Sequence, residues 1–141
     1  MEPVNPRQNR LLAGLPDAEW QHWKPQLEQV DLPLGKVIYE SGMQRTHVYF
    51  PSDAIISLLH VLDNGSSAEI AVIGLEGILG ICTVMGGDAM PSRAVVQSAG
   101  RGYRIGAHAI KLEFDRSHAV MHLLLRYTQA LITQMAQTAV C

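Results

Sequence analysis

Cysteine and clustered cations are scarce in this sequence. The chain of 141 residues contains two cysteines, Cys82 and Cys141, and no run rich in lysine or arginine. Two cysteines cannot by themselves supply a four-ligand zinc or iron–sulfur site. Without clustered cations, the chain lacks the usual means of holding nucleic-acid phosphates. We therefore expect neither a cysteine-bound metal centre nor direct contact of this chain with DNA or RNA.

Long apolar runs are also missing. No stretch reaches the roughly 18 residues that a membrane span needs. The N-terminus, MEPVNPRQNR, is polar and has no apolar core of a signal peptide. The net charge of −2 and the hydrophobic content of 48% are ordinary for a globular domain. These features predict a single cytoplasmic domain.

Short β-type runs, separated by turn residues, fill the middle of the chain. The first 28 residues carry helical patterns, with Trp20, Trp23 and Leu27 on one stripe. From residue 29 to 105 the runs suit strands of an antiparallel barrel or jelly roll. Asn64-Gly65, between two apolar runs, indicates a hairpin with a two-residue type I′ turn. Residues 106–141 return to helical patterns.

The last helix is predicted to begin near Ser117, which suits an N-cap. It carries two apolar stripes. One stripe would cover the domain's own barrel and consists of Val120, Leu124, Tyr127 and Leu131. The other has heptad-like spacing and consists of Met121, Leu125, Thr128, Ile132, Met135 and Ala139. Heptad-like spacing favours a second copy of the same helix, hence a homodimer, over a single buried helix.

The order of these features resembles one protein family. The most specific stretches are NRLLAGLP, LPLGKVIYESG, HVYFP, VLDNGSSAEIAVIGLEGILG and RYTQALITQMAQTA. Over residues 9 to 141 they are similar to the cyclic-nucleotide-binding domain of the Crp/Fnr transcription regulators. The resemblance implies a mainly β double-stranded β-helix (jelly roll) with flanking helices and a long C-terminal dimerisation helix. It also implies a sensor role, and contact with DNA only through a C-terminal helix-turn-helix domain that this chain lacks.

A glycine-rich segment, GLEGILGICTVMGGDAMPSRAVVQ, spans residues 74–97 and corresponds to the family's phosphate-binding cassette. In members that bind cyclic nucleotides, a Gly-Glu pair begins the cassette, and its glutamate bonds the ribose 2′-hydroxyl. Here Ile81 follows Gly80, and in the alternative register Ile78 follows Gly77. The glutamate is therefore missing in either alignment.

The cassette of such members ends in Arg-(Ser/Thr/Ala)-Ala, and its arginine pairs with the cyclic phosphate. With Ala94 on the family's alanine, Ser92 takes the arginine's place. Arg93 is one residue further along, and one step along a strand turns a side chain to the opposite face. We therefore expect a cassette that keeps its shape but does not bind cyclic AMP.

The resemblance marks eight candidate ligand-binding residues: Gly77, Gly80, Ile81, Cys82, Thr83, Ser92, Arg93 and Ala94. The effector and any cofactor are unknown, and neither catalytic nor metal-binding residues are assigned. One alternative keeps a cyclic nucleotide, held by Arg93 and the backbone amides of the glycine-rich loop from Gly80 to Thr83.

Two further alternatives involve a metal. A haem would need axial ligands, and His47, His60 and Cys82 are candidates by residue type only. A cupin-like enzyme would need an HxH cluster, which the sequence does not contain.

Overall fold

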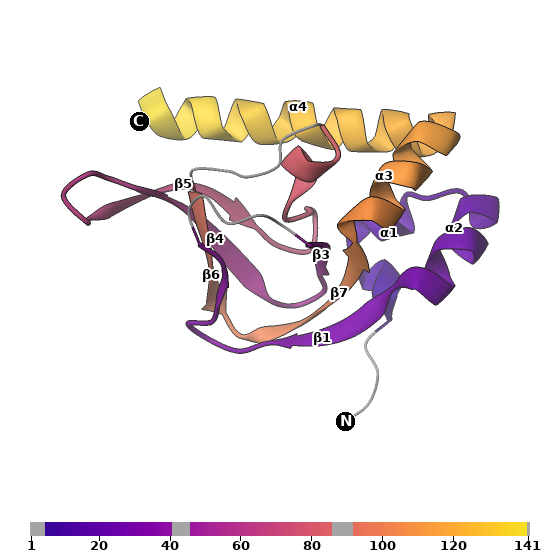
Figure 1. The fold of residues 1–141 in the computed structure, drawn as a ribbon, viewed down its shortest axis with the longest axis horizontal. Coiled ribbons are helices and arrows are strands. Elements are labelled where there is room, and N and C mark those ends of the chain that lie inside the picture. The colour runs from indigo at the N-terminus through magenta and orange to yellow at the C-terminus, as the bar shows by residue number, and fades with distance from the viewer. Residues whose placement is uncertain (1–4, 41–45, 86–91, 141) are drawn as a thin grey trace.

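Figure 1 shows a β-roll with short helices gathered at one end and a long helix lying across both parts. The computed structural model describes residues 5–40, 46–85 and 92–140, with the side chains of the last helix described up to residue 137. The N-terminal helices are η1 (Pro6–Gln8), α1 (Arg10–Ala13), α2 (Asp17–Trp23) and η2 (Lys24–Gln26). The strands are β1 (Glu28–Leu32), β2 (Val37–Tyr39), β3 (His47–Pro51), β4 (Ile55–Val61), β5 (Ser67–Ile73), β6 (Ser92–Ser98) and β7 (Gly100–Gly106). A 3-10 helix, η3 (Ile81–Thr83), lies between β5 and β6, and the chain ends with α3 (Ala107–Arg116) and α4 (His118–Val140).

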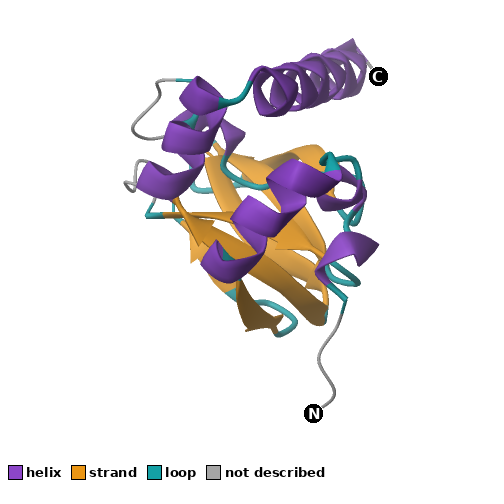
Figure 2. Cartoon of the chain, turned by 90° about the vertical axis from the view of Figure 1, so that its right-hand side faces the viewer, coloured by secondary structure: helices purple, strands orange, loops and turns teal. Residues whose placement is uncertain are grey.

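The strands form two antiparallel sheets, one in the order β1-β7-β3 and the other in the order β2-β6-β4-β5. Leu32 of β1, Ile56 of β4 and Val96 of β6 belong to one buried apolar cluster, so the two sheets face each other. Burial of these alternating side chains holds the sheets together. Figure 2 shows the resulting roll with helices packed around it. The predicted jelly roll with flanking helices is confirmed.

Helix α4 bridges two apolar cores. Its N-terminal half contributes Val120 and Leu124 to the core formed with the N-terminal helices, which also contains Trp23. Further along, Leu131 packs against both this core and the core of the roll. The predicted inner stripe is therefore the face that α4 turns toward its own domain. A movement of α4 would have to repack both cores.

Side-chain caps explain where two helices begin. The Asn9 side-chain oxygen accepts hydrogen bonds from the backbone N–H groups of Leu11 and Leu12, at 3.0 and 3.3 Å. The Ser117 hydroxyl oxygen accepts one from the N–H of Val120 at 3.3 Å. Such bonds satisfy N–H groups that have no partner inside the helix. The prediction of an N-cap at Ser117 is confirmed.

Glu113 is a buried carboxylate that joins α2 to α3. Its Oε1 lies 2.8 Å from Nε2 of His22, and its Oε2 accepts a hydrogen bond from Arg116 at 2.7 Å. Arg116 also pairs with Glu19 of α2 at 2.5 Å. A buried charge is costly unless it is paired in this way. These contacts fix the two helices against each other.

The β4–β5 hairpin lies where Asn64-Gly65 predicts it, but its turn is different. The N–H of Gly65 donates to the carbonyl of Leu62 at 3.0 Å, and the N–H of Leu62 donates to the carbonyl of Ser66 at 2.8 Å. Gly65 has φ of 88°, while no non-glycine residue in the described part of the chain has a positive φ. The predicted two-residue type I′ turn needs a positive φ at Asn64 as well, so it is wrong. The loop has three residues and places Gly65 alone in the left-handed region.

Candidate functional site

The start of the cassette is held by the beginning of α1. Asn9 is fully buried, and its side-chain amide donates to the carbonyls of Pro51, at 2.8 Å, and Gly77, at 2.9 Å. The N–H of Arg10 donates to the carbonyl of Leu75 at 2.7 Å. Buried hydrogen bonds of this kind favour a single arrangement. If one of them breaks, the donor and the acceptor are left buried without water to replace the lost partner. The cassette is thus fixed to both α1 and the end of β3.

Its middle is held by the three-stranded sheet. Leu79 and Tyr49 exchange two backbone hydrogen bonds, at 2.8 and 3.0 Å. Gly80 follows with φ of 100°, a backbone conformation that residues with a Cβ rarely adopt. This turn leads into η3, so Ile81 and Cys82 stand at the start of a short helix. Residues 86–91 of the glycine-rich segment lie outside the described residues.

Strand β6 separates the two residues that could occupy the arginine position. Ser92 and Ala94 are buried and point into the roll, while Arg93 lies between them on the outer face. The Arg93 side chain is 2.6 Å from the carboxylate of Glu40. The Ser92 hydroxyl has no hydrogen-bond partner among the described residues. The inward position therefore carries a small neutral group, and the guanidinium points away from it.

An apolar cavity of about 230 Å³ lies between the cassette and α4. The sheets and the cassette contribute Leu58, Ile73, Ile78, Leu79, Gly80, Ile81, Cys82 and Met85. Helix α4 contributes Thr128, Leu131, Ile132 and Met135. None of these described side chains is charged at neutral pH.

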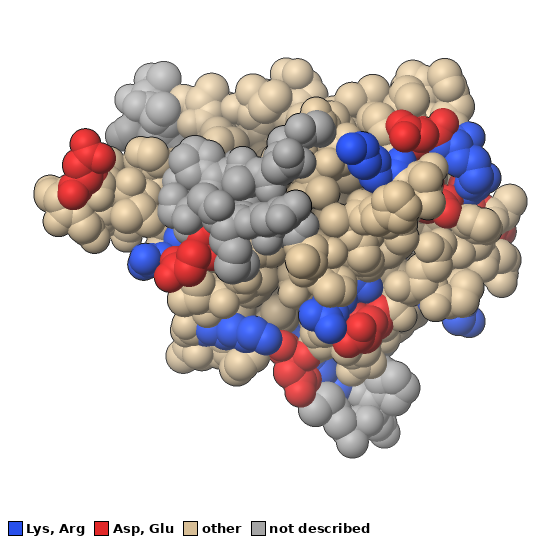
Figure 3. Space-filling model, in the orientation of Figure 1, with Lys and Arg blue, Asp and Glu red and all other residues tan. Residues whose placement is uncertain are grey.

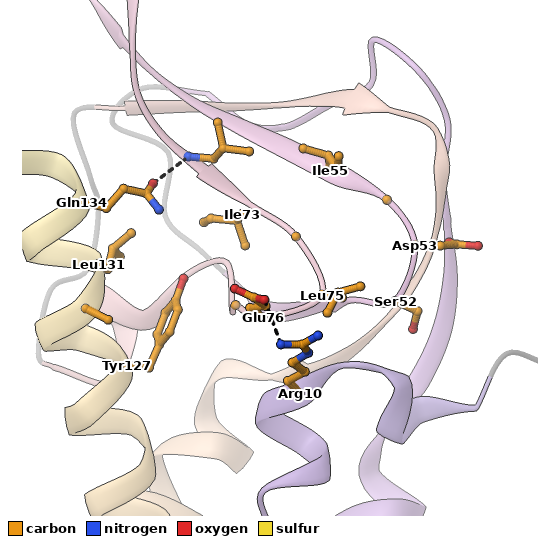
Figure 4. Close-up of a pocket in the computed structure, with 15 residues that line it drawn as sticks. Arg10, Ser52, Asp53, Ile55, Ile73, Leu75, Glu76, Tyr127, Leu131 and Gln134 are labelled. Carbon is orange, nitrogen blue, oxygen red and sulfur yellow. Dashed lines mark hydrogen bonds and ion pairs between the residues drawn. The ribbon is translucent and has the colours of Figure 1, made fainter. Parts of the chain in front are cut away.

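A second and larger cavity, of about 500 Å³, lies where β5 leads into the cassette (Figure 4); we call it the polar groove because its lining, unlike that of the first cavity, includes charged side chains. Arg10 and Glu76 form an ion pair of 3.0 Å at this groove, one from α1 and the other from the cassette. Tyr127 and Gln134 approach it from α4, as the close-up shows. Ile73 and Leu131 line both cavities, so the two spaces adjoin at these side chains.

Tyr127 ties α4 to the cassette backbone. Its hydroxyl donates to the carbonyl of Ile78 at 3.2 Å. Burial raises the pKa of the Tyr127 phenol. Gly77 lies directly beneath the ring, and a Cβ there would sit 2.8 Å from the Tyr127 hydroxyl oxygen. The glycine is needed at this position because the helix approaches so closely.

The eight candidate ligand-binding residues do not all line the same cavity. Gly80, Ile81 and Cys82 line the apolar cavity, and Gly77 lines the polar groove. Arg93 points outward, as described above. Thr83, Ser92 and Ala94 are not among the described residues lining either cavity.

Several lining residues are missing from the sequence-based set. Leu58 and Ile73 alternate inward on β4 and β5, so their strand pattern could have marked them. Asn9 could have been found as a helix-capping residue, because it stands just before an apolar helical run. No pattern in the sequence shows that its amide reaches the cassette.

The predicted dimer residues of α4 differ in exposure. Leu125 and Ile132 are 43% and 55% exposed, whereas Met121, Thr128 and Met135 are partly buried. The side chain of Ala139 lies outside the described residues. In Figure 3 the upper edge, where Figure 1 places α4, is mostly tan, and the described sequence of the helix has only Arg126 as a lysine or arginine. Thr128, Ile132 and Met135 also line the apolar cavity, so one edge of the helix serves two surfaces.

Within the described residues, no group of three or more His, Cys, Asp or Glu side chains could hold a metal ion. The three haem-ligand candidates stand on separate elements: His47 on β3, His60 on β4 and Cys82 on η3. No helix of the described chain is long and apolar enough to cross a membrane.

No family model matches the chain, and no curated protein matches it by sequence. Solved structures do match. The N-terminal domain of a transcriptional regulator from Streptomyces coelicolor A3(2) is 16% identical, with a TM-score of 0.67, over 95% of this chain and 94% of that one. A Geobacter metallireducens GS-15 protein proposed to bind cyclic nucleotides is 14% identical, with a TM-score of 0.74, over 95% of this chain and 99% of that one.

A third similar structure is the regulatory subunit of a cyclic-AMP-independent protein kinase A from Trypanosoma brucei. It is 16% identical, with a TM-score of 0.73, over 86% of this chain. This chain spans 43% of that subunit's length. At these identities the likeness concerns the fold, which is that of a cyclic-nucleotide-binding domain.

Proposed function

We propose that this chain is the sensor and dimerisation module of a Crp/Fnr-type transcription regulator that does not respond to cyclic AMP. The module is one domain, in which the N-terminal helices (1–28), the roll (29–105) and the C-terminal helices (106–141) act together. The observation that carries the proposal is the geometry of β6. A buried Ser92 occupies the inward position, and Arg93 is paired with Glu40 on the other face.

The energetic consequence is large. A cyclic nucleotide would bring an anionic phosphate to a cassette whose inward side chains, Ile81 and Ser92, carry no charge. Charge-assisted hydrogen bonds contribute roughly 1.5–3 kcal/mol each. Without the ribose and phosphate anchors, affinity falls by about two to four orders of magnitude. One structure of similar fold is the regulatory subunit of a cyclic-AMP-independent protein kinase A.

The alternative of a cyclic nucleotide held by Arg93 has a specific obstacle. Arg93 would have to leave Glu40 and reach through or around β6 to the inward face. Among the described residues, the inward side would then offer backbone amides near Gly80 and the hydroxyl of Ser92 as donors. The geometry therefore favours a sensor of another effector.

Helix α4 supplies the route by which a signal would leave the domain. It contacts the cassette through Tyr127 and both cores through its inner stripe. Its outer edge, with Leu125 and Ile132, is apolar and exposed in the single chain. A second copy would bury that edge, and a shift of α4 would then change the packing of the two copies.

Calorimetry with cyclic AMP, cyclic GMP and cyclic di-GMP tests the ligand half of the proposal. We expect no binding in the physiological range for any of the three. A low-micromolar dissociation constant for cyclic AMP would contradict the proposal. Glu40→Ala, which frees Arg93, serves as a control and should not create binding.

Sedimentation velocity tests the dimer half. Leu125→Glu places a charge on the outer edge near its symmetry mate and should convert a dimer to a monomer while circular dichroism stays unchanged. Leu125 suits this test better than Ile132, which also lines the apolar cavity. Thr133→Glu, on a different face of the same helix, is the matched control and should remain dimeric. A wild-type chain that is monomeric at tens of micromolar would contradict the proposed dimer.

A further inference from the structure

The apolar cavity has a chemical character that the proposed function leaves unused. Its floor is formed by Leu58 and Ile73 of the roll, one wall by Ile81 and Cys82 of the cassette, and the other by Ile132 and Met135 of α4. Met85 and Ile132 are partly exposed, so in this single chain the space opens to the surface. A pocket of about 230 Å³ between the roll and α4 is therefore accessible to a small molecule from solvent.

The cavity offers almost nothing to a charged ligand. Its described lining side chains carry no charge, and the one hydroxyl among them belongs to Thr128. That hydroxyl donates to the carbonyl of Leu124 within α4, at 2.8 Å. An ion placed there would lose its hydration without gaining a partner, which is strongly unfavourable. A neutral apolar molecule gains from leaving water instead.

The size of the cavity limits the occupant. An apolar cavity of about 150 Å³ holds one benzene molecule. The 230 Å³ found here therefore suits a molecule of two fused rings or of similar bulk. A partner helix is about 10 Å across and is too wide to enter. At most one side chain of a second copy could reach in.

We propose that the cavity between the cassette and α4 binds a small, neutral and largely apolar molecule, of about the size of a two-ring aromatic compound. The inference rests on the proposed sensor function and names the class of effector. Such a ligand would touch Cys82 on the cassette and Ile132 on α4 at once. Filling the space would fix the distance between them and so bias the position of the helix.

The test uses 1-naphthol, which is neutral, and 1-naphthoate, which has a similar size and a negative charge. Binding to the purified chain is measured by fluorescence and by calorimetry. We expect saturable binding of 1-naphthol and at least about tenfold weaker binding of 1-naphthoate. No saturable binding of 1-naphthol, or equal binding of the two compounds, would overturn the ligand class.

Two tryptophan substitutions locate the site. Met85 is partly exposed at the cavity, so Met85→Trp fills it with little risk to folding and should weaken 1-naphthol binding by about tenfold or more. Ala130→Trp is the matched control, because Ala130 is exposed and lines the polar groove instead. It should leave the affinity unchanged. Loss of binding in Ala130→Trp alone would place the ligand in the groove and overturn the proposal.

The remaining outcomes separate this inference from the proposed function. Binding of 1-naphthol only to the Leu125→Glu chain would mean that a second copy fills the cavity, and would overturn the inference. Low-micromolar binding of cyclic AMP contradicts the proposed function, whatever 1-naphthol does. If 1-naphthol does not bind, while the chain is a stable dimer that does not bind cyclic AMP, only the proposed ligand class is contradicted.

Discussion

Leu124 and Leu125 are adjacent in α4, yet the first is 1% exposed and the second 43% exposed. The two residues belong to the inner and outer stripes of the helix, which are about equally apolar in sequence. The inner stripe fills a core with Trp23 and other buried side chains. On the outer stripe, Leu125 and Ile132 are exposed, while Met121, Thr128 and Met135 are partly buried. The difference indicates that the inner stripe stabilises the fold, whereas the outer edge is available for the proposed dimer.

The largest effect is expected from truncating the inner stripe. Leu124→Ala leaves a cavity in the core and should lower the free energy of unfolding by about 2–5 kcal/mol. Leu125→Ala removes the same atoms from the exposed edge and should change it by less than about 0.5 kcal/mol. Urea unfolding at a concentration low enough to keep the chain monomeric measures both. Equal losses would mean that the two edges of α4 are not distinct.

A smaller effect is expected where the inner face meets the cassette. The Cβ of Gly77→Ala would collide with the Tyr127 hydroxyl, and overpacking of this kind costs about 1–3 kcal/mol. Tyr127→Phe alone loses one hydrogen bond, to Ile78, at a cost of about 1 kcal/mol. Because the second change removes the atom that the first one strikes, the double variant should lose less than the sum. Strict additivity in urea unfolding would show that Tyr127 does not rest on Gly77.

The smallest effect is a dependence on alkaline pH. Burial raises the pKa of Tyr127 in the folded chain above the value of about 10 of an unfolded tyrosine. The stabilisation is complete below the unfolded pKa and is lost as the pH rises through the folded one. Wild-type stability should therefore fall more steeply above about pH 10 than that of Tyr127→Phe. If the free energies of unfolding of the two chains depended on pH in the same way, the pKa of Tyr127 would be the same in the folded and unfolded states.

Local signals in the sequence were sufficient for much of the fold. Ser117 predicts the start of α4 because a hydroxyl before a helical run satisfies a free N–H. Asn64-Gly65 predicts the place of the β4–β5 hairpin. The inner stripe of α4 follows from helical spacing alone. Each of these depends on residues within a few positions of one another.

Features that depend on distant contacts could not be predicted in the same way. The type of the hairpin turn is set by how Leu62 and Ser66 meet across the loop. The amide of Asn9 reaches Gly77, far along the chain, only after the roll has formed. The apolar cavity arises because α4 lies over the cassette at one particular distance. Ile132 belongs to the predicted dimer stripe and also lines this cavity. The helical spacing of the sequence cannot distinguish these two positions.

Gln134 has a role at the border of the roll. Strand β5 ends the four-stranded sheet, and open strand edges can recruit strands from other molecules. The side-chain oxygen of Gln134 accepts a hydrogen bond from the N–H of Val72 on β5, at 3.0 Å, so α4 occupies part of that edge. Detaching the helix would expose a template for aggregation. The solubility of this chain therefore depends on its last helix staying in place.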